Sequence, residues 1–452
     1  MKISVPEKLN SLALACPFPL YIVGGYVRDA IAGLKCNAPD IDICAPVSAD
    51  EFLKVVEACG GEIDAVYRNT GTVKLGLGDE KYEFTCFRSD EYVRGVHTPV
   101  KTFFTDDIAL DARRRDFKCN AVYYDVAKGE LCDPLGGIDD IKNKTINTVT
   151  DADKVFGEDG LRLMRLARFA AQLNFTPTKE CLAGAKNNGK LIADISVERI
   201  YAELDAILHA DEKYGFEGAQ YMGLKVLDEI RVLDVILPEL ALGRGMEQNK
   251  AFHNHDVLEH SLRSALYADK SIRLAALLHD IGKPRAFIDN GNYYGHEVIG
   301  AEIAERVCAR LKVPKKLTAE VVRLTGLHMY DLKCDAREGK IRKLIVANKD
   351  IFDKLLLIKQ ADFSACCDNS DEAPCVTKWK GIYEKMKKEG APTELKELAI
   401  KGDEVMAAGV PAKLVGKVLE ELLVDCALNA RLNDKKTLLG RVEKGIREGK
   451  FI

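Results

Sequence analysis

Apolar and polar residues follow two different patterns along this chain. Over the first 145 or so residues, short apolar runs are separated by turn signals, and residues 71–88 alternate between apolar and polar positions. Alternation with period two is typical of strands, whereas a Ser cap or a terminal glycine marks the end of a helix. The predicted elements are, in order, a strand at 19–25, a helix at 26–34 that ends at Gly33, a strand at 40–46, a helix at 48–61 and a hairpin at 71–88.

The second pattern begins after Asp151, where strand signals almost vanish and apolar residues recur at helical spacing to the end of the chain. Weak breaks fall near Gly215, at 237–249 and at 366–374. The two patterns together predict an α+β protein, with a head made of a small mixed sheet and helices, followed by an all-helical body.

Composition and charge narrow the functional classes. The 452 residues are 47% hydrophobic and 30% charged, as in a soluble globular protein of several domains. No apolar run is long enough to span a membrane, and Pro6 and Glu7 make the N-terminal segment a poor signal peptide. Fourteen scattered cysteines form no C-x-x-C pair, which favours reduced thiols and a cytoplasmic location. The formal net charge of −4 requires any nucleic-acid surface to be local.

Two aspartates make the strand at 40–46 a candidate metal site. Strand residues alternate between faces, so Asp40 and Asp42 point the same way, about 7 Å apart, while Ile41 and Ile43 point into the core. Two carboxylates on one face repel each other unless a cation lies between them, and Mg²⁺ suits such ligands. Glu83 in the hairpin is a third carboxylate. Two metals held by the three could activate an attacking hydroxyl and steady a leaving pyrophosphate.

A glycine turn and an arginine precede these aspartates. Gly24 and Gly25 allow the backbone to approach phosphate oxygens, the helix N-terminus that follows favours anions, and Arg28 adds a charged donor. A lone D-x-D is usually a solvated strand end, and a lone Gly-Gly is usually only a turn. The order GG-x-x-R-D, ten residues, D-x-D is far more specific, and it predicts a triphosphate beside the metal.

A helix predicted within 156–175 carries Arg162, Arg165 and Arg168 at i+3 spacing, with apolar residues crowded between them. Arginines on an enclosed helix need anionic or hydrogen-bonding partners, and a triphosphate with its base would supply both. The alternative is an ion-pair network that joins two domains.

Histidines gather in one part of the helical body, where six of the eight lie between His253 and His328. Imidazoles and carboxylates from several helices make a divalent-metal site, and the candidates are His260, His279, Asp280 and Asp362. A lone core histidine is more often structural than metallated, which is the alternative for each of them.

Four ordered motifs resemble one known family. They are GGYVRD…DID (24–42), DARRRDFKCNAVYYD (111–125), DPLGGIDDI (133–141) and FGEDGLRLMRLARFAAQLNF (156–175). The chain resembles the bacterial tRNA nucleotidyltransferase and poly(A) polymerase family, the class II branch of the polymerase-beta-like nucleotidyltransferases. The resemblance implies a polymerase-beta-like head and an ED-x-x-R helix, which Gly160 interrupts near its start in this chain.

The resemblance also implies roles by position. Asp40 and Asp42 would bind magnesium, with Glu83 in the place of the third carboxylate. The implied nucleotide contacts are Gly24, Gly25 and Arg28 for the phosphates, Arg115 and Asp116 for the ribose, Asp159 and Arg162 for the base with Glu158 holding Arg162, and Arg165 and Arg168 as further contacts.

The histidine-rich segment is similar to the HD superfamily of metal-dependent phosphohydrolases, whose ligand order is H…HD…D. His260, His279, Asp280 and Asp362 match that order. His296 and His328 match the extra histidines of some members, and His253 and His255 are further candidates. The resemblance implies a second divalent metal of unspecified identity and either hydrolysis of RNA ends or nucleotides, or a scaffold role.

The predicted organisation is a nucleotidyltransferase head at 1–145, a helical neck at 146–235, an HD domain at 236–370 and a helical tRNA-binding body and tail at 371–452. The polar segment 88–112 is expected to be a mobile loop. The tail has basic clusters that suit RNA phosphates, although solvated helix faces are the simpler interpretation of each: Lys378, Lys380, Lys385, Lys387 and Lys388, then Lys435 and Lys436.

The resemblance predicts a CCA-adding tRNA nucleotidyltransferase that uses CTP, ATP and Mg²⁺ and binds the acceptor end and elbow of tRNA. Poly(A) polymerase, or an enzyme adding only CC or only A, keeps the same chemistry. An HD phosphohydrolase with an RNA-binding head, or a non-catalytic RNA-binding protein, would be a different class.

Overall fold

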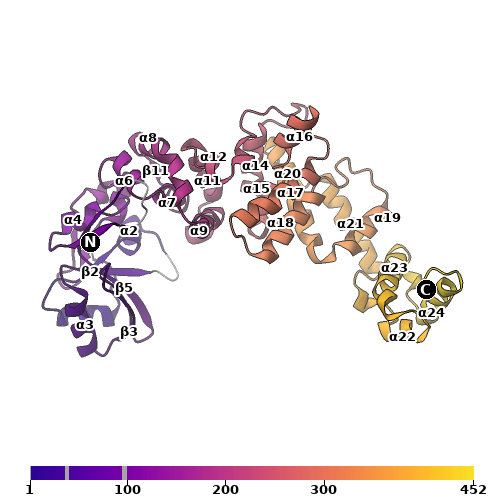
Figure 1. Ribbon diagram of the computed structural model, residues 1–452, viewed down its shortest axis with the longest axis horizontal. Helices are drawn as coiled ribbons and strands as arrows, with labels where there is room; N and C mark the ends of the chain where they lie inside the picture. The colour runs from indigo at the N-terminus through magenta and orange to yellow at the C-terminus, as the bar shows by residue number, and fades with distance from the viewer. Residues whose placement is uncertain (1, 36–39, 94–98, 452) are drawn as a thin grey trace. The chain divides into compact units, whose positions relative to one another are not determined.

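The computed structural model describes residues 2–35, 40–93 and 99–451. The chain folds as two compact units, unit 1 (Met1–Leu242 with Arg310–Val313) and unit 2 (Gly243–Ala309 with Pro314–Ile452) (Figure 1). None of the helices in the described ranges is both long and apolar enough to cross a membrane.

A seven-stranded mixed sheet is the core of the N-terminal part of unit 1, in the order β3-β4-β5-β2-β1-β8-β9. Strands β2 and β5 run parallel, and the other neighbouring pairs are antiparallel. The strands are β1 (Tyr21–Val23), β2 (Ile41–Ala45), β3 (Glu62–Tyr67), β4 (Thr72–Leu77), β5 (Glu80–Cys86), β8 (Tyr123–Asp125) and β9 (Glu130–Cys132). The helices of unit 1 are α1 (Glu7–Ala15), α2 (Gly25–Ala32), α3 (Ala49–Ala58), α4 (Ile108–Arg113), α5 (Gly137–Asn143), α6 (Ala152–Glu158), α7 (Leu161–Leu173), α8 (Lys179–Asn188), α9 (Val197–Leu208), α10 (Asp211–Tyr214), α11 (Ala219–Glu229), α12 (Leu233–Ile236) and α13 (Pro238–Ala241).

The helices beside the sheet begin and end at the predicted signals. Helix α2 stops at Gly33, whose φ of 70° lies in the left-handed region. Helix α3 starts with a capping box, in which Ser48 and Glu51 satisfy each other's backbone N–H groups. Phe52 of α3 stacks on Phe84 of β5 with ring centroids 3.6 Å apart, which packs the helix on the sheet. The predicted strands, helices and hairpin up to residue 88 are therefore present.

The segment 88–112 differs from the expected loop. Strands β6 (Arg88–Glu91) and β7 (Lys101–Phe104) form an antiparallel pair, and α4 follows; residues 94–98 of this segment lie outside the described residues. Two of the charges that suggested a solvated loop instead pair within β6. Asp90 forms an ion pair with Arg88 at 3.2 Å and accepts from the Thr102 hydroxyl at 3.0 Å.

The remainder of unit 1 is helical apart from a two-stranded parallel sheet of β10 (Thr145–Ile146) and β11 (Thr176–Pro177). The ED-x-x-R segment forms two helices, because the chain breaks between α6 and α7 at Asp159 and Gly160, where Gly160 was expected to interrupt the helix near its start. A Cβ on Gly160 would lie 2.6 Å from the backbone oxygen of Leu191, so close packing against the neck requires glycine there.

Unit 2 is helical throughout its described residues. Its last helices have a hydrophobic core of their own, which includes Val405, Leu422, Leu438 and Val442. The helices are α14 (Val257–Tyr267), α15 (Arg273–Leu278), α16 (Lys283–Asn290), α17 (His296–Arg310), α18 (Lys315–Leu327), α19 (Glu338–Ala347), α20 (Phe352–Cys367), α21 (Pro374–Glu389), α22 (Gly402–Ala407), α23 (Val415–Leu428) and α24 (Lys435–Arg447).

The α6–α7 break generates a stability prediction. We expect Gly160→Ala to lower the free energy of unfolding by about 1–3 kcal/mol, because the new methyl group overlaps backbone that cannot rotate away. Urea denaturation monitored by circular dichroism measures the change. The control is Gly157→Ala in α6, whose Cβ would meet only the Asn188 side chain, at 3.6 Å. Equal losses for the two variants would contradict this account of the break.

Candidate functional site

A cavity of about 630 Å³ in unit 1 brings together most of the predicted nucleotide and metal residues. The predicted residues that line it are Gly24, Gly25, Arg28, Asp40, Asp42, Arg115, Asp116, Asp159, Arg162, Arg165 and Arg168. Glu83 and Glu158 do not line the cavity themselves. Glu83 lies opposite Asp42 in the sheet, and Glu158 accepts a hydrogen bond from Arg162. The cavity is lined by eight basic and five acidic side chains, so it suits an anion that is bound together with cations.

The carboxylates lie where β2 and β5 run side by side. Asp42 is directly opposite Glu83 in the parallel register, so the two side chains share a face. A Cβ on Gly24, whose φ is 82°, would lie 3.3 Å from Asp42 Oδ2, which puts the glycine turn against this carboxylate. Asp40 is exposed just before β2, and Lys74 forms an exposed ion pair with Glu83 at 3.5 Å.

The pKa of Asp42 reflects this crowding. Partial desolvation by the surrounding protein raises the pKa, the Arg115 guanidinium opposes that rise, and the neighbouring Glu83 and Asp40 add to it. A group of oxygen ligands whose mutual repulsion raises a carboxyl pKa fits a bound divalent cation, because the cation removes the repulsion.

Arg28 is held rigidly beside the carboxylates. Its side chain is 2% exposed, its Nε and Nη2 donate to Asp29 Oδ1 at 2.9 and 2.7 Å, and its Nη1 donates to Asn120 Oδ1 at 2.7 Å. Tyr214 of α10 donates its hydroxyl to the other oxygen of Asp29. Asp29 and Asn120, with Tyr214 of α10 behind Asp29, thus fix the direction of the Arg28 guanidinium.

Arg115 belongs to a second buried group, centred on Asp111. The carboxylate of Asp111 accepts from Arg114 Nε at 2.7 Å, Arg115 Nη2 at 3.1 Å and the Tyr123 hydroxyl at 2.7 Å. Burial alone would raise the pKa of Asp111, but the guanidiniums of Arg115 and Arg114 outweigh it and lower the pKa to about 2. Asp111 therefore remains ionised and holds both arginines toward the cavity.

The three arginines of α7 form the ridge that their spacing predicts. Arg165 donates to Asp116 Oδ2 at 2.8 Å through Nε, and Arg168 donates to Glu203 Oε2 at 2.6 Å. Burial alone would raise the pKa of Asp116, but the Arg165 cation and the hydrogen bonds from neighbouring groups outweigh it and lower the pKa to about 2. The ion-pair alternative is thus partly correct, since each of these arginines has a protein carboxylate while its guanidinium lines the cavity.

Arg162 has the partner that the resemblance implies. Its Nη1 donates to Glu158 Oε2 at 2.8 Å and to the Val155 carbonyl at 2.9 Å, and its Nη2 donates to the Arg114 carbonyl at 2.8 Å. Asp159 Oδ1 accepts from the first N–H of α7, that of Leu161, at 3.0 Å. Asp159 and Arg162 both line the cavity, so a donor and an acceptor meet there from opposite sides of the α6–α7 break.

Sequence reasoning missed several lining residues. Asn120 and Arg114 lie inside a motif that was noticed for other residues, so the motif itself was the available signal. Arg199 and Lys213 come from α9 and α10, where no local pattern distinguishes them from surface cations.

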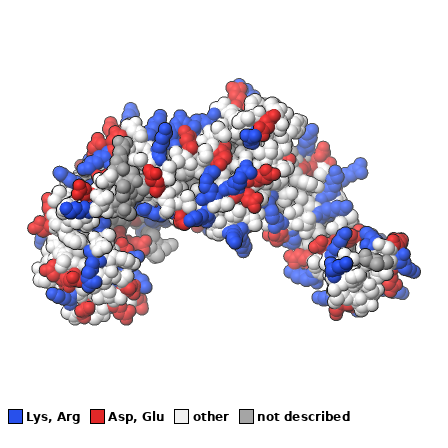
Figure 2. Space-filling model, in the orientation of Figure 1, with Lys and Arg blue, Asp and Glu red and all other residues white. Residues whose placement is uncertain are grey.

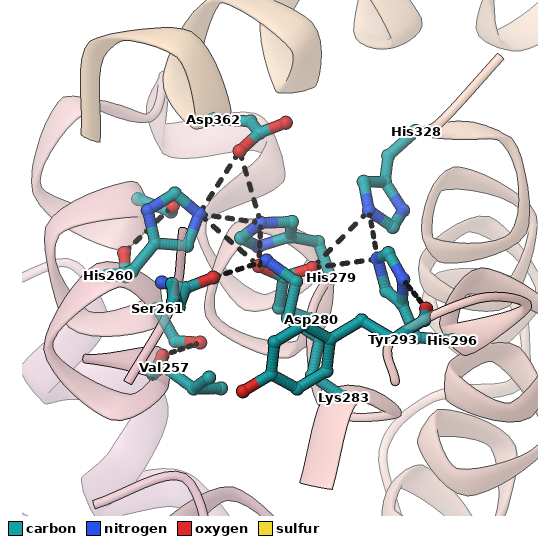
Figure 3. Close-up of polar contacts among 12 residues, drawn as sticks. Val257, His260, Ser261, His279, Asp280, Lys283, Tyr293, His296, His328 and Asp362 are labelled. Carbon is teal, nitrogen blue, oxygen red and sulfur yellow. Dashed lines mark hydrogen bonds and ion pairs between the residues drawn. The ribbon is translucent and has the colours of Figure 1, made fainter. Parts of the chain in front are cut away.

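The second site lies in unit 2, where six side chains from several helices converge (Figure 3). His260 of α14 and His279, which follows α15, turn their Nε2 atoms to within 3.2 Å of each other. Both atoms face Asp362 Oδ1 of α20, at 3.1 and 3.5 Å, and Asp280 Oδ2, at 3.3 and 3.2 Å. The predicted H…HD…D residues therefore form one cluster, which we call the HD cluster and which is buried except for the partly exposed Asp362.

His296 and His328 complete a second half of the HD cluster. Their Nε2 atoms lie 3.3 Å apart and face Asp280 Oδ1 at 3.1 and 3.5 Å. Asp280 thus contacts His260 and His279 through Oδ2, and His296 and His328 through Oδ1. Lys283 lies at its Oδ2, 2.5 Å away, and donates to Gln248 Oε1 at 2.7 Å.

The tautomers of three histidines suit metal binding. His279, His296 and His328 hold their Nδ1 atoms 2.7, 2.7 and 2.6 Å from backbone carbonyl oxygens, so Nδ1 carries the proton and Nε2 is free to coordinate. Burial alone would lower the pKa of His279, but Asp280 and Asp362 outweigh it and raise the pKa to about 10. The paired carboxylates therefore attract a positive charge, and the donor set fits a divalent ion.

The other two histidine candidates lie beside the HD cluster. The ring of His253 lies edge-on to that of His260, with centroids 5.0 Å apart. His255 points away from the cluster and pairs with Asp368 at 3.1 Å.

The basic clusters of the C-terminal part lie mostly on exposed, ion-paired faces. Lys380, Lys385, Lys387 and Lys435 each pair with a glutamate, at 2.5 to 2.9 Å. On the visible face, Lys and Arg side chains are interspersed with Asp and Glu side chains (Figure 2). These lysines therefore carry no separate argument for RNA binding.

Three family models match the chain in order. They are the poly A polymerase head domain at residues 20–147, the probable RNA and SrmB-binding site of polymerase A at 174–242, and the HD domain at 257–355.

Among curated proteins, the A-adding tRNA nucleotidyltransferase of Deinococcus radiodurans is 30% identical over 372 residues, which is 77% of each chain. The CCA-adding enzyme of Lactobacillus helveticus is 38% identical over 186 residues, 41% of this chain and 45% of that protein.

Solved structures share the fold. The Bacillus stearothermophilus CCA-adding enzyme in complex with CTP matches with a TM-score of 0.66 and 21% identity over 98% of both chains. A tRNA nucleotidyltransferase complexed with a primer tRNA and an incoming ATP analog matches with a TM-score of 0.57 and 23% identity over 85% of this chain and all of that one. The predicted mixed-sheet head and helical body with an HD domain are confirmed. The chain belongs to the tRNA nucleotidyltransferase family and is a nucleotidyltransferase with an HD domain.

Proposed function

We propose that the protein adds CMP and AMP from CTP and ATP to the 3′ end of tRNA, without a nucleic-acid template and with Mg²⁺. The observation that carries the proposal is the cavity of unit 1, where Asp40 and Asp42 face the ridge of arginines from α7. That arrangement can hold a metal-bound triphosphate at one side and a base at the other. The names of the relatives support tRNA as the acceptor.

In the proposed reaction, the 3′-hydroxyl of the RNA attacks the α-phosphorus of the nucleotide. The new phosphodiester bond forms as the bond from the α-phosphorus to the β-phosphate oxygen breaks, and pyrophosphate leaves. Asp40, Asp42 and Glu83 would hold magnesium, which when bound lowers the pKa of the hydroxyl and neutralises the phosphates. The protein itself supplies position and charge, as phosphoryl transfer requires.

The arginines of the cavity orient the nucleotide. Arg28, Arg115 and Arg165 each have a carboxylate partner, so they present guanidinium groups of fixed direction to the phosphates and ribose. Asp159 and Arg162 supply an acceptor and a donor that can read the edge of cytosine or adenine. Glu158 accepts from Arg162 and would keep that guanidinium directed at the base.

A narrower reaction, addition of A alone, is a second candidate. It is favoured by the name of the relative that aligns over 77% of both chains, which is an A-adding tRNA nucleotidyltransferase. The chemistry and site are the same in both cases, and only the base specificity differs.

For the HD cluster, we propose a divalent metal and hydrolysis of phosphate esters at RNA ends. His260, His279, Asp280 and Asp362 would hold the ion, with His296 and His328 beside a second position. Lys283, next to Asp280, would attract a phosphate group.

tRNA transcripts that end at different points of the CCA sequence test the main proposal. A tRNA transcript that ends before the CCA sequence should gain CCA when CTP and ATP are both present, and one that ends in CC should gain A from ATP alone. Gel electrophoresis with labelled nucleotides measures both. Extension only of the CC-ending transcript would support the A-adding candidate, and tails of many A residues would support a poly(A) polymerase.

Asp42→Asn tests the carboxylate site. We expect it to lower the rate of nucleotide incorporation by about 10²-fold or more, since losing one metal-binding charge removes several kcal/mol of transition-state stabilisation. The control is Asp64→Asn in β3, an exposed carboxylate of the same sheet that pairs with Lys81. Undiminished incorporation by Asp42→Asn would refute the assigned role.

His279→Ala tests the HD cluster independently. We expect release of phosphate from a ribonucleoside 2′-phosphate, or opening of a 2′,3′-cyclic phosphate, to fall to background. The variant lacks the buried imidazole that contacts both Asp280 and Asp362 and would bind the metal with them. His209→Ala, directly after α9 in unit 1, serves as the matched control. Hydrolysis that survives in the alanine variant would place the activity elsewhere, and no hydrolysis by the parent protein would indicate a scaffold.

A further inference from the structure

The segment that carries His253 is fastened to the C-terminal end of α20. The backbone N–H of Asn254 donates to the Cys366 carbonyl at 2.9 Å, and His255 pairs with Asp368 at 3.1 Å. Both contacts lie directly C-terminal to His253 and restrict where that residue lies. His253 is therefore held against the end of α20, next to the HD cluster.

Three potential metal ligands meet at this point. One donor atom each of His253, His260 and Cys366 lies within 4.8 Å of the other two. Cys366 stands four residues after Asp362 in α20, so both side chains lie on the face of that helix that borders the HD cluster. The three residues, which we call the soft-donor subsite, come from three separate segments of the chain.

Unpartnered nitrogens mark the soft-donor subsite as incomplete. The side chain of His260 is fully buried, and its Nδ1 has no hydrogen-bond partner among the residues that the structure describes. Within the same described ranges, Nδ1 of His253 is likewise buried and unpartnered. His253 and His260 differ in this respect from His279, His296 and His328, whose Nδ1 atoms are hydrogen-bonded to backbone carbonyl oxygens. A buried polar atom with no partner costs free energy and calls for a ligand.

We propose that His253, His260 and Cys366 bind a thiophilic divalent cation of the zinc class. A thiolate with two imidazoles is a soft donor set, which selects such ions over magnesium or calcium. For one sulfur and two nitrogens on a tetrahedral zinc, the ligand atoms lie about 3.3–3.6 Å apart, since Zn–N and Zn–S bonds are about 2.0 and 2.3 Å. The donor atoms lie within 4.8 Å of one another, so they must close by about 1.5 Å at most. The soft-donor subsite shares His260 with the HD cluster, and it rests on the metal binding proposed for that cluster only through this residue. His260 would bind the zinc-class ion through Nδ1, and with a second ion at Nε2 its ring would release both protons to solvent and bridge the two ions as an imidazolate.

Cobalt(II) is the probe, because it replaces zinc and its spectrum reports sulfur ligation. We expect the full-length protein, stripped of metal and titrated with cobalt chloride, to develop visible ligand-field bands and a near-ultraviolet band from thiolate-to-cobalt charge transfer. Cys366→Ser should abolish the near-ultraviolet band. The matched control is Cys367→Ser, the neighbouring exposed thiol, which donates instead to the Phe252 carbonyl and should leave the band intact.

A second variant and a second measurement guard against misfolding. His253→Gln leaves Cys366 untouched and should weaken cobalt binding at the subsite about tenfold or more. X-ray absorption of the zinc-loaded unmutated protein should show a sulfur neighbour at about 2.3 Å.

The outcomes separate the two proposals. Visible bands with no near-ultraviolet band, a band that survives Cys366→Ser, or zinc with only nitrogen and oxygen neighbours would overturn the soft-donor subsite and leave the HD cluster standing. No cobalt bands of any kind would overturn both.

Discussion

The parallel pairing of β2 with β5 is the constraint on which the nucleotidyl site depends. In a sheet whose other neighbouring pairs are antiparallel, this register places Asp42 opposite Glu83, and Asp42 lies against the Gly24 turn. Desolvation first, and then the neighbouring carboxylates of Glu83 and Asp40, raise the pKa of Asp42, and a bound divalent cation would favour its charged form. Folding thus builds a site that favours a metal-bound anion before any substrate arrives.

The same electrostatic logic extends over the rest of the cavity. Asp111 and Asp116 stay ionised, with pKa values of about 2, because arginines surround them, and in return they fix where Arg115 and Arg165 point. An arginine without such a partner would be costly to bury and free to move. Preorganised charges need little rearrangement when the triphosphate binds, which is how a protein without covalent chemistry of its own promotes phosphoryl transfer. The HD cluster repeats the principle with histidines, whose Nδ1 hydrogen bonds orient Nε2.

Local sequence signals were sufficient for β1, β2, β4 and β5, for α2 and α3 and for the motif residues, but not for β3, β8 or β9. Period-two alternation, the Ser48 cap and Gly33 predicted elements that depend mainly on neighbours in sequence. Prediction failed where distant contacts decide the structure. Gly160 was recognised as an interruption of the helix, but no local signal shows that the carbonyl of Leu191 leaves no room for a Cβ there. Strands β6 and β7 were missed because their charges resemble those of a loop, and the sequence does not show that Arg88 contacts Thr70 and Asp111.

The candidate sites divide in the same way. Residues within a motif could be named from the sequence, whereas Arg199, Lys213 and Tyr214 reach the nucleotidyl cavity or its arginines from the neck helices without any local signal. His253 and Cys366 are separated by more than a hundred residues and become neighbours only because the 252–255 segment docks on α20.

Anomalous diffraction from crystals grown with Mn²⁺ and a non-hydrolysable CTP analogue tests the central claim most directly. The account predicts a manganese peak that bridges the carboxylates of Asp40 and Asp42 and the phosphates of the analogue, with carboxylate oxygens about 2.1 Å away. An ordered analogue with no anomalous peak at these side chains would contradict it.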